Sequence, residues 1–176
     1  MTQLRRTAFT LGCILALAGC QTMNAPVLVT AGAPPAKPLP YGRVAEVQIE
    51  AVKPWQSVGV TLAAAESYRI TASGRWSVGA MCGHTDADSR GNNPFCTTDS
   101  DNLGFPAGSL IGRVGTAGAP FLVGSNKILT PATNGELFLR SYDWLPEDNF
   151  GALTIRVSHN DSAAGGEPPP AHRDPL

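Results

Sequence analysis

The stretch Ala45-Glu46-Val47-Gln48-Ile49-Glu50-Ala51 decides the fold class, because apolar and polar residues alternate along it. A period of two half-buries a β-strand, whereas a helix would repeat its apolar residues every three to four positions. The same alternation, or a short apolar run, returns in further stretches: 58–62, 68–76, 110–114, 121–123, 137–142 and 153–158. The pattern predicts about seven short strands.

Composition supports an all-β chain. Of the 176 residues, 19 are Gly and 15 are Pro, only 15% are charged, and no helical stripe follows residue 44. Short strands joined by many turns fold into a jelly-roll-like β-sandwich, or into a small barrel with the same pattern. The formal net charge of −1 weighs against a nucleic-acid partner, because such partners require a basic surface.

The first residues resemble an export signal. Arg5 and Arg6 precede an apolar run at 8–18, which is too short to span a bilayer. Leu17-Ala18-Gly19-Cys20 matches the bacterial lipobox, which predicts a signal peptide at 1–19, lipidation of Cys20 and attachment to the membrane through that lipid. Gln21 follows Cys20, and by the sorting convention it directs the chain to the outer membrane of a Gram-negative bacterium. A buried first helix with a chance cysteine is the alternative.

Pro-rich segments flank the predicted domain. Residues 20–43 contain five prolines and are rich in alanine, which predicts a semi-extended tether. Residues 159–176 have a similar composition and predict a disordered tail. The folded domain is therefore expected at 44–158.

One segment at 81–106 interrupts the strand rhythm and predicts a long loop. Cys82 and Cys96 bracket its first half, and in an exported chain such a pair most often forms a disulfide. A zinc site formed by Cys82, His84 and Cys96 is the alternative, although it lacks a fourth ligand.

Two acidic turns are candidates for a cation. Asp86-x-Asp88-x-Arg90-Gly91 begins like a calcium loop but breaks the pattern at Arg90, and Asp99 and Asp101 add carboxylates nearby. The turn at 142–151 offers Asp143, Asp148 and Asn149, whose oxygens suit calcium. The simpler interpretation of both turns is that Asp, Asn and Gly tolerate tight backbone geometry.

The order of several motifs over about residues 46–158 resembles the PA-I-type galactophilic lectin family, small calcium-dependent jelly-roll sandwiches of the galactose-binding-domain-like kind. The motifs are Trp55 with Ser57-Val58-Gly59-Val60, Ala72-Ser73-Gly74-Arg75-Trp76, Gly108-Ser109-Leu110-Ile111-Gly112-Arg113-Val114-Gly115, Gly135-Glu136-Leu137-Phe138-Leu139-Arg140 and Asp148-Asn149-Phe150-Gly151-Ala152-Leu153-Thr154-Ile155.

The resemblance implies a calcium site and a sugar site before the last strand. Asp143, Asp148, Asn149 and a backbone carbonyl near Val78 would bind the ion, and sugar hydroxyls would complete its shell. Trp144 would pack on the sugar, with Glu147 as a second ligand-binding side chain. This turn is shorter than in the family and lacks a matching Thr, and the His and Gln that touch galactose there have no secure counterpart.

The sequence therefore leads to two functional hypotheses. The first is a lipid-anchored module that binds carbohydrate, with calcium as the possible cofactor. The second is a structural or accessory envelope lipoprotein that uses the sandwich for protein contacts and has lost sugar binding.

An enzyme is not expected, because G-x-S-x-G and H-E-x-x-H are missing from the sequence. Asp143 and Glu147 could form a glycosidase-like pair, as could any two loop acids. Trp55 and Trp76 are expected to be core or rim aromatics.

Overall fold

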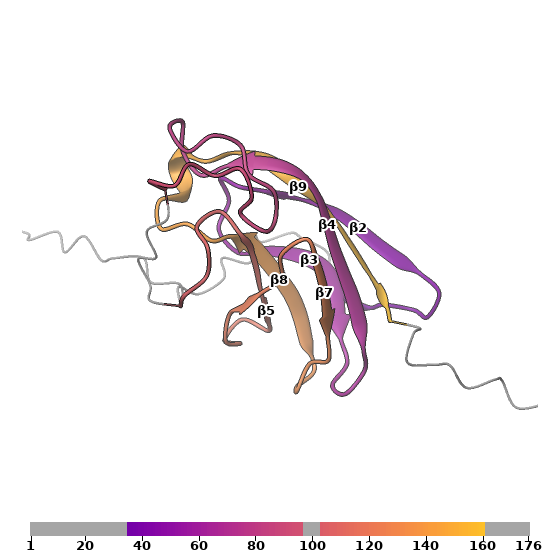
Figure 1. The fold of residues 1–176 in the computed structure, drawn as a ribbon. Coiled ribbons are helices and arrows are strands. Elements are labelled where there is room, and N and C mark those ends of the chain that lie inside the picture. Colours follow the sequence, from indigo (N-terminus) through magenta and orange to yellow (C-terminus); the bar gives the residue numbers. More distant parts are fainter. Residues whose placement is uncertain (1–34, 97–102, 161–176) are drawn as a thin grey trace, which may run out of the picture.

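The computed structural model describes residues 35–96 and 103–160, which form two packed β-sheets (Figure 1). The elements are β1 (Lys37–Pro38), β2 (Val44–Glu50), β3 (Gln56–Leu62), β4 (Tyr68–Ser77), β5 (Leu110–Val114), β6 (Phe121–Leu122), β7 (Asn126–Leu129), β8 (Gly135–Ser141), the 3₁₀ turn η1 (Pro146–Asp148) and β9 (Phe150–His159). The predicted all-β sandwich with one long disulfide-tied loop is confirmed.

The sheets are built from strands far apart in the sequence. One sheet has the order β1-β3-β8-β5-β6, and the other has the order β2-β9-β4-β7. Among the described strands, all pairs are antiparallel except β1 with β3. The last strand, β9, lies between the edge strand β2 and β4, so an early strand and the last strand of the domain pair in one sheet.

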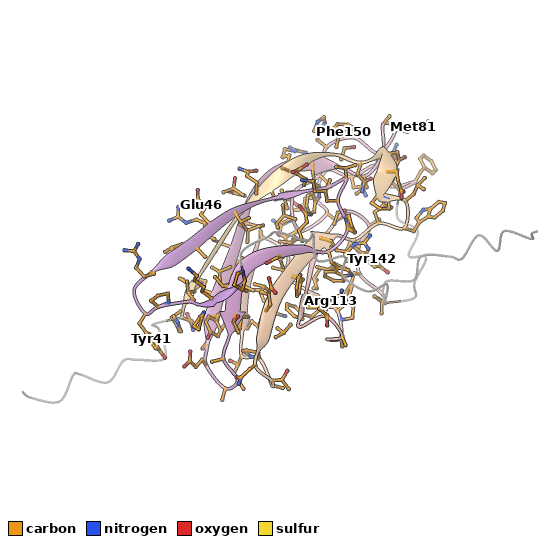
Figure 2. All side chains as sticks on the ribbon, turned by 180° about the vertical axis from the view of Figure 1, so that it is seen from behind. Tyr41, Glu46, Met81, Arg113, Tyr142 and Phe150 are labelled. Atoms are coloured by element: carbon orange, nitrogen blue, oxygen red, sulfur yellow. A yellow bond between two sulfur atoms is a disulfide. The ribbon has the colours of Figure 1, made fainter. Side chains whose placement is uncertain are left out.

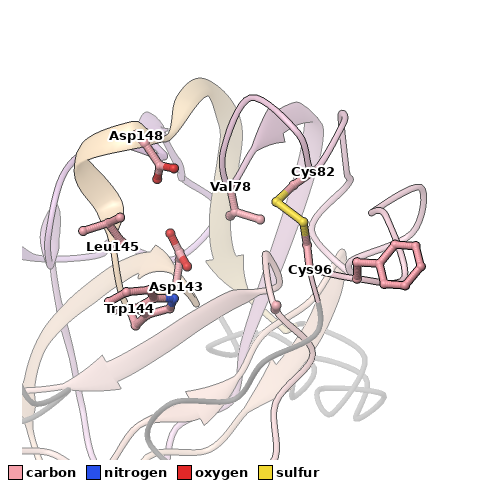
Figure 3. A pocket seen from close by; sticks show the side chains of 9 residues that line it. Val78, Cys82, Cys96, Asp143, Trp144, Leu145 and Asp148 are labelled. Carbon is pink, nitrogen blue, oxygen red and sulfur yellow. A yellow bond between two sulfur atoms is a disulfide. The ribbon is translucent and has the colours of Figure 1, made fainter.

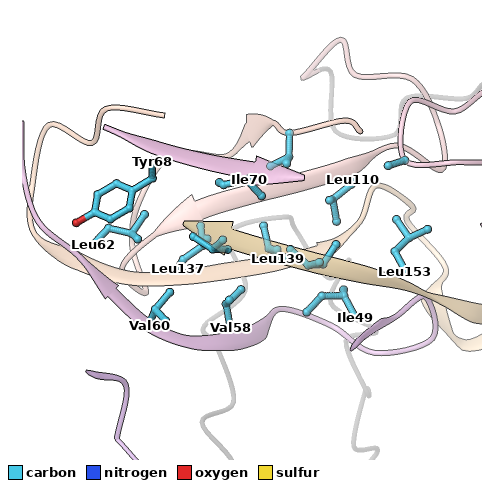
Figure 4. Close-up of a cluster of buried hydrophobic side chains, with 14 of the residues drawn as sticks. Ile49, Val58, Val60, Leu62, Tyr68, Ile70, Leu110, Leu137, Leu139 and Leu153 are labelled. Carbon is cyan, nitrogen blue, oxygen red and sulfur yellow. The ribbon is translucent and has the colours of Figure 1, made fainter. Parts of the chain in front are cut away.

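The period of two places every second side chain between the sheets (Figure 4). Tyr68, Ile70 and Trp76 are buried in β4, while Arg69 and Arg75 on the opposite parity face outward. The inner faces share one apolar cluster that includes Ile49, Val58, Val60, Leu62, Leu110, Leu137, Leu139, Leu153, Ile155 and Val157. Burial of this cluster is the main force that holds the sheets together.

The ordered domain begins earlier than the predicted boundary at residue 44. Strand β1 pairs with Val60 and Thr61 of β3, and Leu39 enters the core. His159, the last residue of β9, donates from Nε2 to the carbonyl of Leu39 over 2.7 Å. A two-residue edge strand containing a proline has too little pattern to be distinguished within a Pro-rich stretch, so the sequence alone predicts a tether there.

The described ends of the chain lie at one end of the sandwich. Tyr41 stacks on His159 there, and Figure 2 shows Tyr41 at the end opposite Met81 and Phe150. The predicted tail at 159–176 starts too early, because His159 is still part of β9. The predicted signal peptide, Cys20, most of the tether and residues 161–176 lie outside the described residues.

Within the described parts of the chain, no helix has the length and apolar character needed to cross a bilayer.

Candidate functional site

The candidate site lies where three strand ends meet. β4 ends at Ser77 opposite Phe150, the first residue of β9, and β8 ends at Ser141. The chain beyond these ends brings Val78, Asp143 and Asp148 to one cavity of about 210 Å³ (Figure 3). Its full lining is Val78, Cys82, Phe95, Cys96, Ala107, Asp143, Trp144, Leu145 and Asp148.

Asp143 is half-buried and lines the cavity. Burial raises the pKa of its carboxyl above the ordinary value, and the nearby charge of Asp148 raises it further. The amide of Asn149 and the backbone N–H groups of Trp144 and Leu145 act in the opposite direction by stabilising the ionised form. Figure 3 shows the carboxylates of Asp143 and Asp148 pointing toward one another. Two acids so arranged repel each other unless a cation lies between them.

Asn149 is buried beneath the same turn. Its Nδ2 donates to the carbonyl of Ala51 over 3.3 Å and to Oγ of Ser141 over 3.4 Å. Ser141 in turn donates from Oγ to the same Ala51 carbonyl over 3.0 Å. The amide nitrogen is thus attached to the scaffold, which leaves Oδ1 as the group available to a ligand.

Two buried oxygens at this site have no hydrogen-bond partner: Oδ2 of Asp143 and Oδ1 of Asn149. Buried acceptors are normally paired, so two orphaned ones in one turn require an explanation. Both are hard oxygen ligands of the kind that calcium prefers. No group of three or more His, Cys, Asp and Glu side chains with metal-binding potential occurs in residues 35–96 and 103–160. An ion here would therefore depend on amide, carbonyl and ligand oxygens in addition to two carboxylates.

Gly79 lets the carboxylate of Asp148 approach the end of β4. A Cβ at this residue would lie 3.0 Å from Oδ2 of Asp148, and the φ of +121° also disfavours a side chain. Ser77 donates from Oγ to the carbonyl of Gly79 over 2.8 Å and thereby supports the turn after Val78. The backbone near Val78 and the Asp148 carboxylate are consequently close neighbours.

The disulfide forms one wall of the cavity. Cys82 and Cys96 are bonded, with Cα atoms 5.7 Å apart, as the sequence predicted. The zinc alternative with His84 is wrong, because both sulfurs are used in the disulfide and neither is a free thiolate. Instead, His84 packs edge-on against the ring of Phe150.

The other acidic turn serves the fold. Oδ1 of Asp86 accepts the backbone N–H groups of Asp88 and Arg90, each over 2.9 Å. Asp88 accepts from Ser125 through the backbone N–H at 2.7 Å and Oγ at 2.6 Å, and these bonds lower the pKa of Asp88. Because the scaffold satisfies these carboxylates, the hypothesis of a cation at this turn loses its basis. Asp99 and Asp101 lie outside the described residues.

Aromatic and aliphatic side chains surround the two acids. Trp144 is 59% exposed and lines the cavity, as does Phe95, which is 93% exposed. Phe95 and Leu145 could not be predicted as lining residues, because a single apolar residue in a turn carries no periodic signal. Glu147 is exposed and is not among the lining residues, since successive side chains of a 3₁₀ turn point about 120° apart. Of the two predicted ligand-binding residues, Trp144 therefore lines the cavity and Glu147 does not.

The two other tryptophans are buried, as expected. Trp76 is fully buried between the sheets and donates from Nε1 to the carbonyl of Gly108 over 2.7 Å. Trp55 is 5% exposed on the outer side of the five-stranded sheet, beneath the guanidinium of Arg113.

Comparisons with known proteins give a structural match. No family model matches the chain, and no curated protein does. Among solved structures, the chain is similar to a domain described as "EclA N-terminal domain; PllA-like lectin", with 24% identity and a TM-score of 0.53. The match covers 65% of this chain and 95% of that domain. At this identity the finding concerns the fold alone: the chain folds as this lectin domain does.

Proposed function

We propose that this chain is a carbohydrate-binding module whose site is completed by calcium. Asp143, Asp148 and Asn149 would supply side-chain oxygens, and the backbone near Val78 would supply a carbonyl. The observation that carries the proposal is the pair of orphaned buried oxygens, Oδ2 of Asp143 and Oδ1 of Asn149, beside a second carboxylate.

The chemistry of the site suits a polyhydroxylated ligand. Calcium takes six to eight oxygens, more than this turn offers, so hydroxyl groups of a sugar or water would complete the shell. A bound ion of this kind would polarise and orient two vicinal hydroxyls of the sugar. The exposed rings of Trp144 and Phe95 lie where the apolar face of a sugar could pack. The fold shared with a lectin domain supports the same assignment.

Anchoring by lipid at Cys20 is part of the proposal. It rests on the lipobox at 17–20 and on the short apolar run before it. The hydrogen bond from His159 to the carbonyl of Leu39 holds the first described residues at one end of the sandwich. Phe150, which begins β9 next to the cavity, lies at the opposite end. A membrane-bound chain, at the outer membrane by the sorting convention, would then direct the site away from its anchor.

Calorimetry tests the proposal directly. The full chain in detergent is titrated with methyl glycosides of galactose, mannose, fucose and glucose, first with calcium and then with EGTA. We expect heat from at least one sugar with calcium and none with EGTA. The matched variants are D148N, which should lose binding, and E147Q, which changes an exposed acid of the same turn and should retain it. Calcium-independent heat, or no heat with any sugar, would overturn the proposal.

A protein partner is the second candidate. Met81, Phe95 and Trp144 are 87%, 93% and 59% exposed, and such apolar groups are common at interfaces between proteins. An accessory envelope lipoprotein of this kind would bind its partner equally well with calcium or EGTA. Pull-down from envelope extracts under both conditions separates the two candidates.

A further inference from the structure

Arg140 lies on the outer side of the five-stranded sheet, immediately before the turn that carries Asp143. Its neighbours in β8, Leu139 and Ser141, are buried, and Arg140 itself is only 8% exposed. Across the sheet it pairs with Ile111, which belongs to a second apolar cluster formed by Trp55, Ile111, Phe138 and Tyr142. A guanidinium in such surroundings needs defined hydrogen-bond partners.

The guanidinium finds acceptors in the backbone of the turn. Nε donates to the carbonyl of Ser141 over 2.9 Å, and Nη2 donates to the carbonyl of Asp143 over 2.6 Å. Hydrogen bonds from a charged donor are shorter and stronger than neutral ones, and the planar fork of arginine holds two acceptors in one geometry. Arg140 therefore ties the end of β8 to the residue that bears the orphaned carboxylate oxygen.

The guanidinium also makes a cation–π contact with Trp55. Its Cζ lies 5.9 Å from the centroid of the Trp55 ring, and Cζ of Arg113 lies 4.4 Å from the same centroid. Cations attract the faces of indole rings at such distances. Arg113 is 1% exposed, which leaves it little room to move. Trp55 and Arg113 are thus buried neighbours of Arg140.

The hydrogen bond from Arg140 involves the backbone carbonyl of Asp143 and leaves its side-chain carboxylate unpaired with arginine. Arg140 bonds to the carbonyl of Asp143 and not to Oδ2, which has no partner. An arginine paired with the carboxylate itself would compete with any cation, whereas this arrangement does not.

From this geometry we infer that Arg140 is a positioning residue of the calcium site: it fixes the backbone of Asp143 while leaving the carboxylate charge to the ion. The inference rests on the proposed function, because it concerns the same ion. The hydrogen bond from Nη2 of Arg140 lies close to the cavity, because the residue that accepts it, Asp143, and the next residue, Trp144, both line the cavity.

Calcium titration of the full chain tests the inference, with R140M and R140K compared against R156M. Arg156 is exposed on the other sheet and pairs with Glu46 over 3.3 Å, so R156M removes an arginine remote from the turn. We expect R140M to weaken calcium binding by about tenfold or more. R140K keeps the charge but loses the planar fork, and should weaken binding to a smaller extent. R156M should bind as wild type does.

Thermal unfolding in EGTA separates positioning from a general loss of stability. A purely structural role would lower the melting temperature and leave the calcium affinity of the folded protein unchanged, and that result for R140M would overturn the inference. If R140M does not fold, R140K carries the test, and wild-type affinity in R140K overturns it. A wild-type chain that binds no calcium would instead refute the proposed function, and this inference with it.

Discussion

The turn at Asp86–Arg90 and the turn at Asp143–Asn149 each place two aspartates close together, yet their oxygens differ in surroundings. Asp86 receives two backbone N–H groups, and Asp88 receives the N–H and Oγ of Ser125. In the second turn, the amide of Asn149 and the N–H groups of Trp144 and Leu145 stabilise the ionised Asp143 carboxyl, yet its Oδ2 and the Oδ1 of Asn149 have no hydrogen-bond partner. The number of acids therefore does not distinguish a structural turn from a binding turn, whereas the satisfaction of their oxygens does.

The largest effect should come from exchanging one acid in each turn. We expect D143N to abolish calcium binding, and D86N to leave it unchanged. In EGTA at pH 7 the two variants should change the melting temperature in opposite directions. D143N removes a desolvated charge and should raise it. D86N removes charge-assisted hydrogen bonds worth about 1–3 kcal/mol and should lower it. Calorimetry and thermal unfolding measure both. Retained calcium binding in D143N would break the comparison.

Removing the disulfide should be the next largest effect. Reduction, or the C82S/C96S double variant, frees a loop of sequence separation 14, and the chain-entropy estimate gives a loss of about 3 kcal/mol. Because Cys82 and Cys96 line the cavity, glycoside affinity should fall as well. Urea unfolding and calorimetry provide the two readings. Unchanged affinity after reduction would show that this wall does not contribute to the site.

The two turns should also respond in opposite ways to acid. Burial raises the pKa of Asp143, so the folded state binds its proton more tightly, and this group adds stability to the calcium-free protein as pH falls. Hydrogen bonds from Ser125 lower the pKa of Asp88, so its contribution is present above the ordinary aspartate pKa and is lost as pH falls through the lowered value. Urea unfolding in EGTA between pH 3 and 7 should show the D143N and D88N profiles diverging from wild type in opposite directions.

Calcium binding itself should weaken with falling pH, beginning above the range in which an ordinary aspartate protonates. The raised pKa of Asp143 is the reason, since the ion and the proton compete for one carboxylate. A midpoint below the ordinary aspartate pKa would contradict the role given to this residue.

The smallest effect should come from the aromatic rim. W144A removes a ring that lines the cavity, and loss of such a contact costs about 1 kcal/mol, or about fivefold in glycoside affinity. Calcium affinity measured without sugar should stay unchanged, because the indole offers no oxygen. E147Q is the control and should change neither affinity. A loss in E147Q equal to that in W144A would restore Glu147 as a ligand-binding residue.

The sequence predicted those strands whose alternation is long. The stretch at 110–114 is β5 residue for residue, and the alternation at 45–51 predicts β2 within one residue. β1 and β7 were not predicted, since Lys37–Pro38 and Asn126–Leu129 are short edge strands that owe their conformation to a neighbour. Tertiary pairing decides such segments, and local pattern does not.

The site could be predicted only in part for a similar reason. Val78, Asp143, Trp144 and Asp148 do line one cavity, and Asn149 lies below it. Phe95 reaches the site because it lies in the loop that the disulfide closes. Arg140 reaches it from the outer side of a sheet, through its bond to the carbonyl of Asp143. Spacing in the sequence reveals neither contact. Which oxygens lack donors likewise depends on the folded surroundings of each residue.

A crystal structure of the full chain grown with millimolar calcium would test the central claim most directly. The account predicts one ion bound at about 2.3–2.6 Å from both Oδ2 of Asp143 and Oδ1 of Asn149, with Asp148 in the same shell. The contrary result would be those two oxygens accepting hydrogen bonds from ordered water or from a rotated Asn149 amide, with no ion beside them.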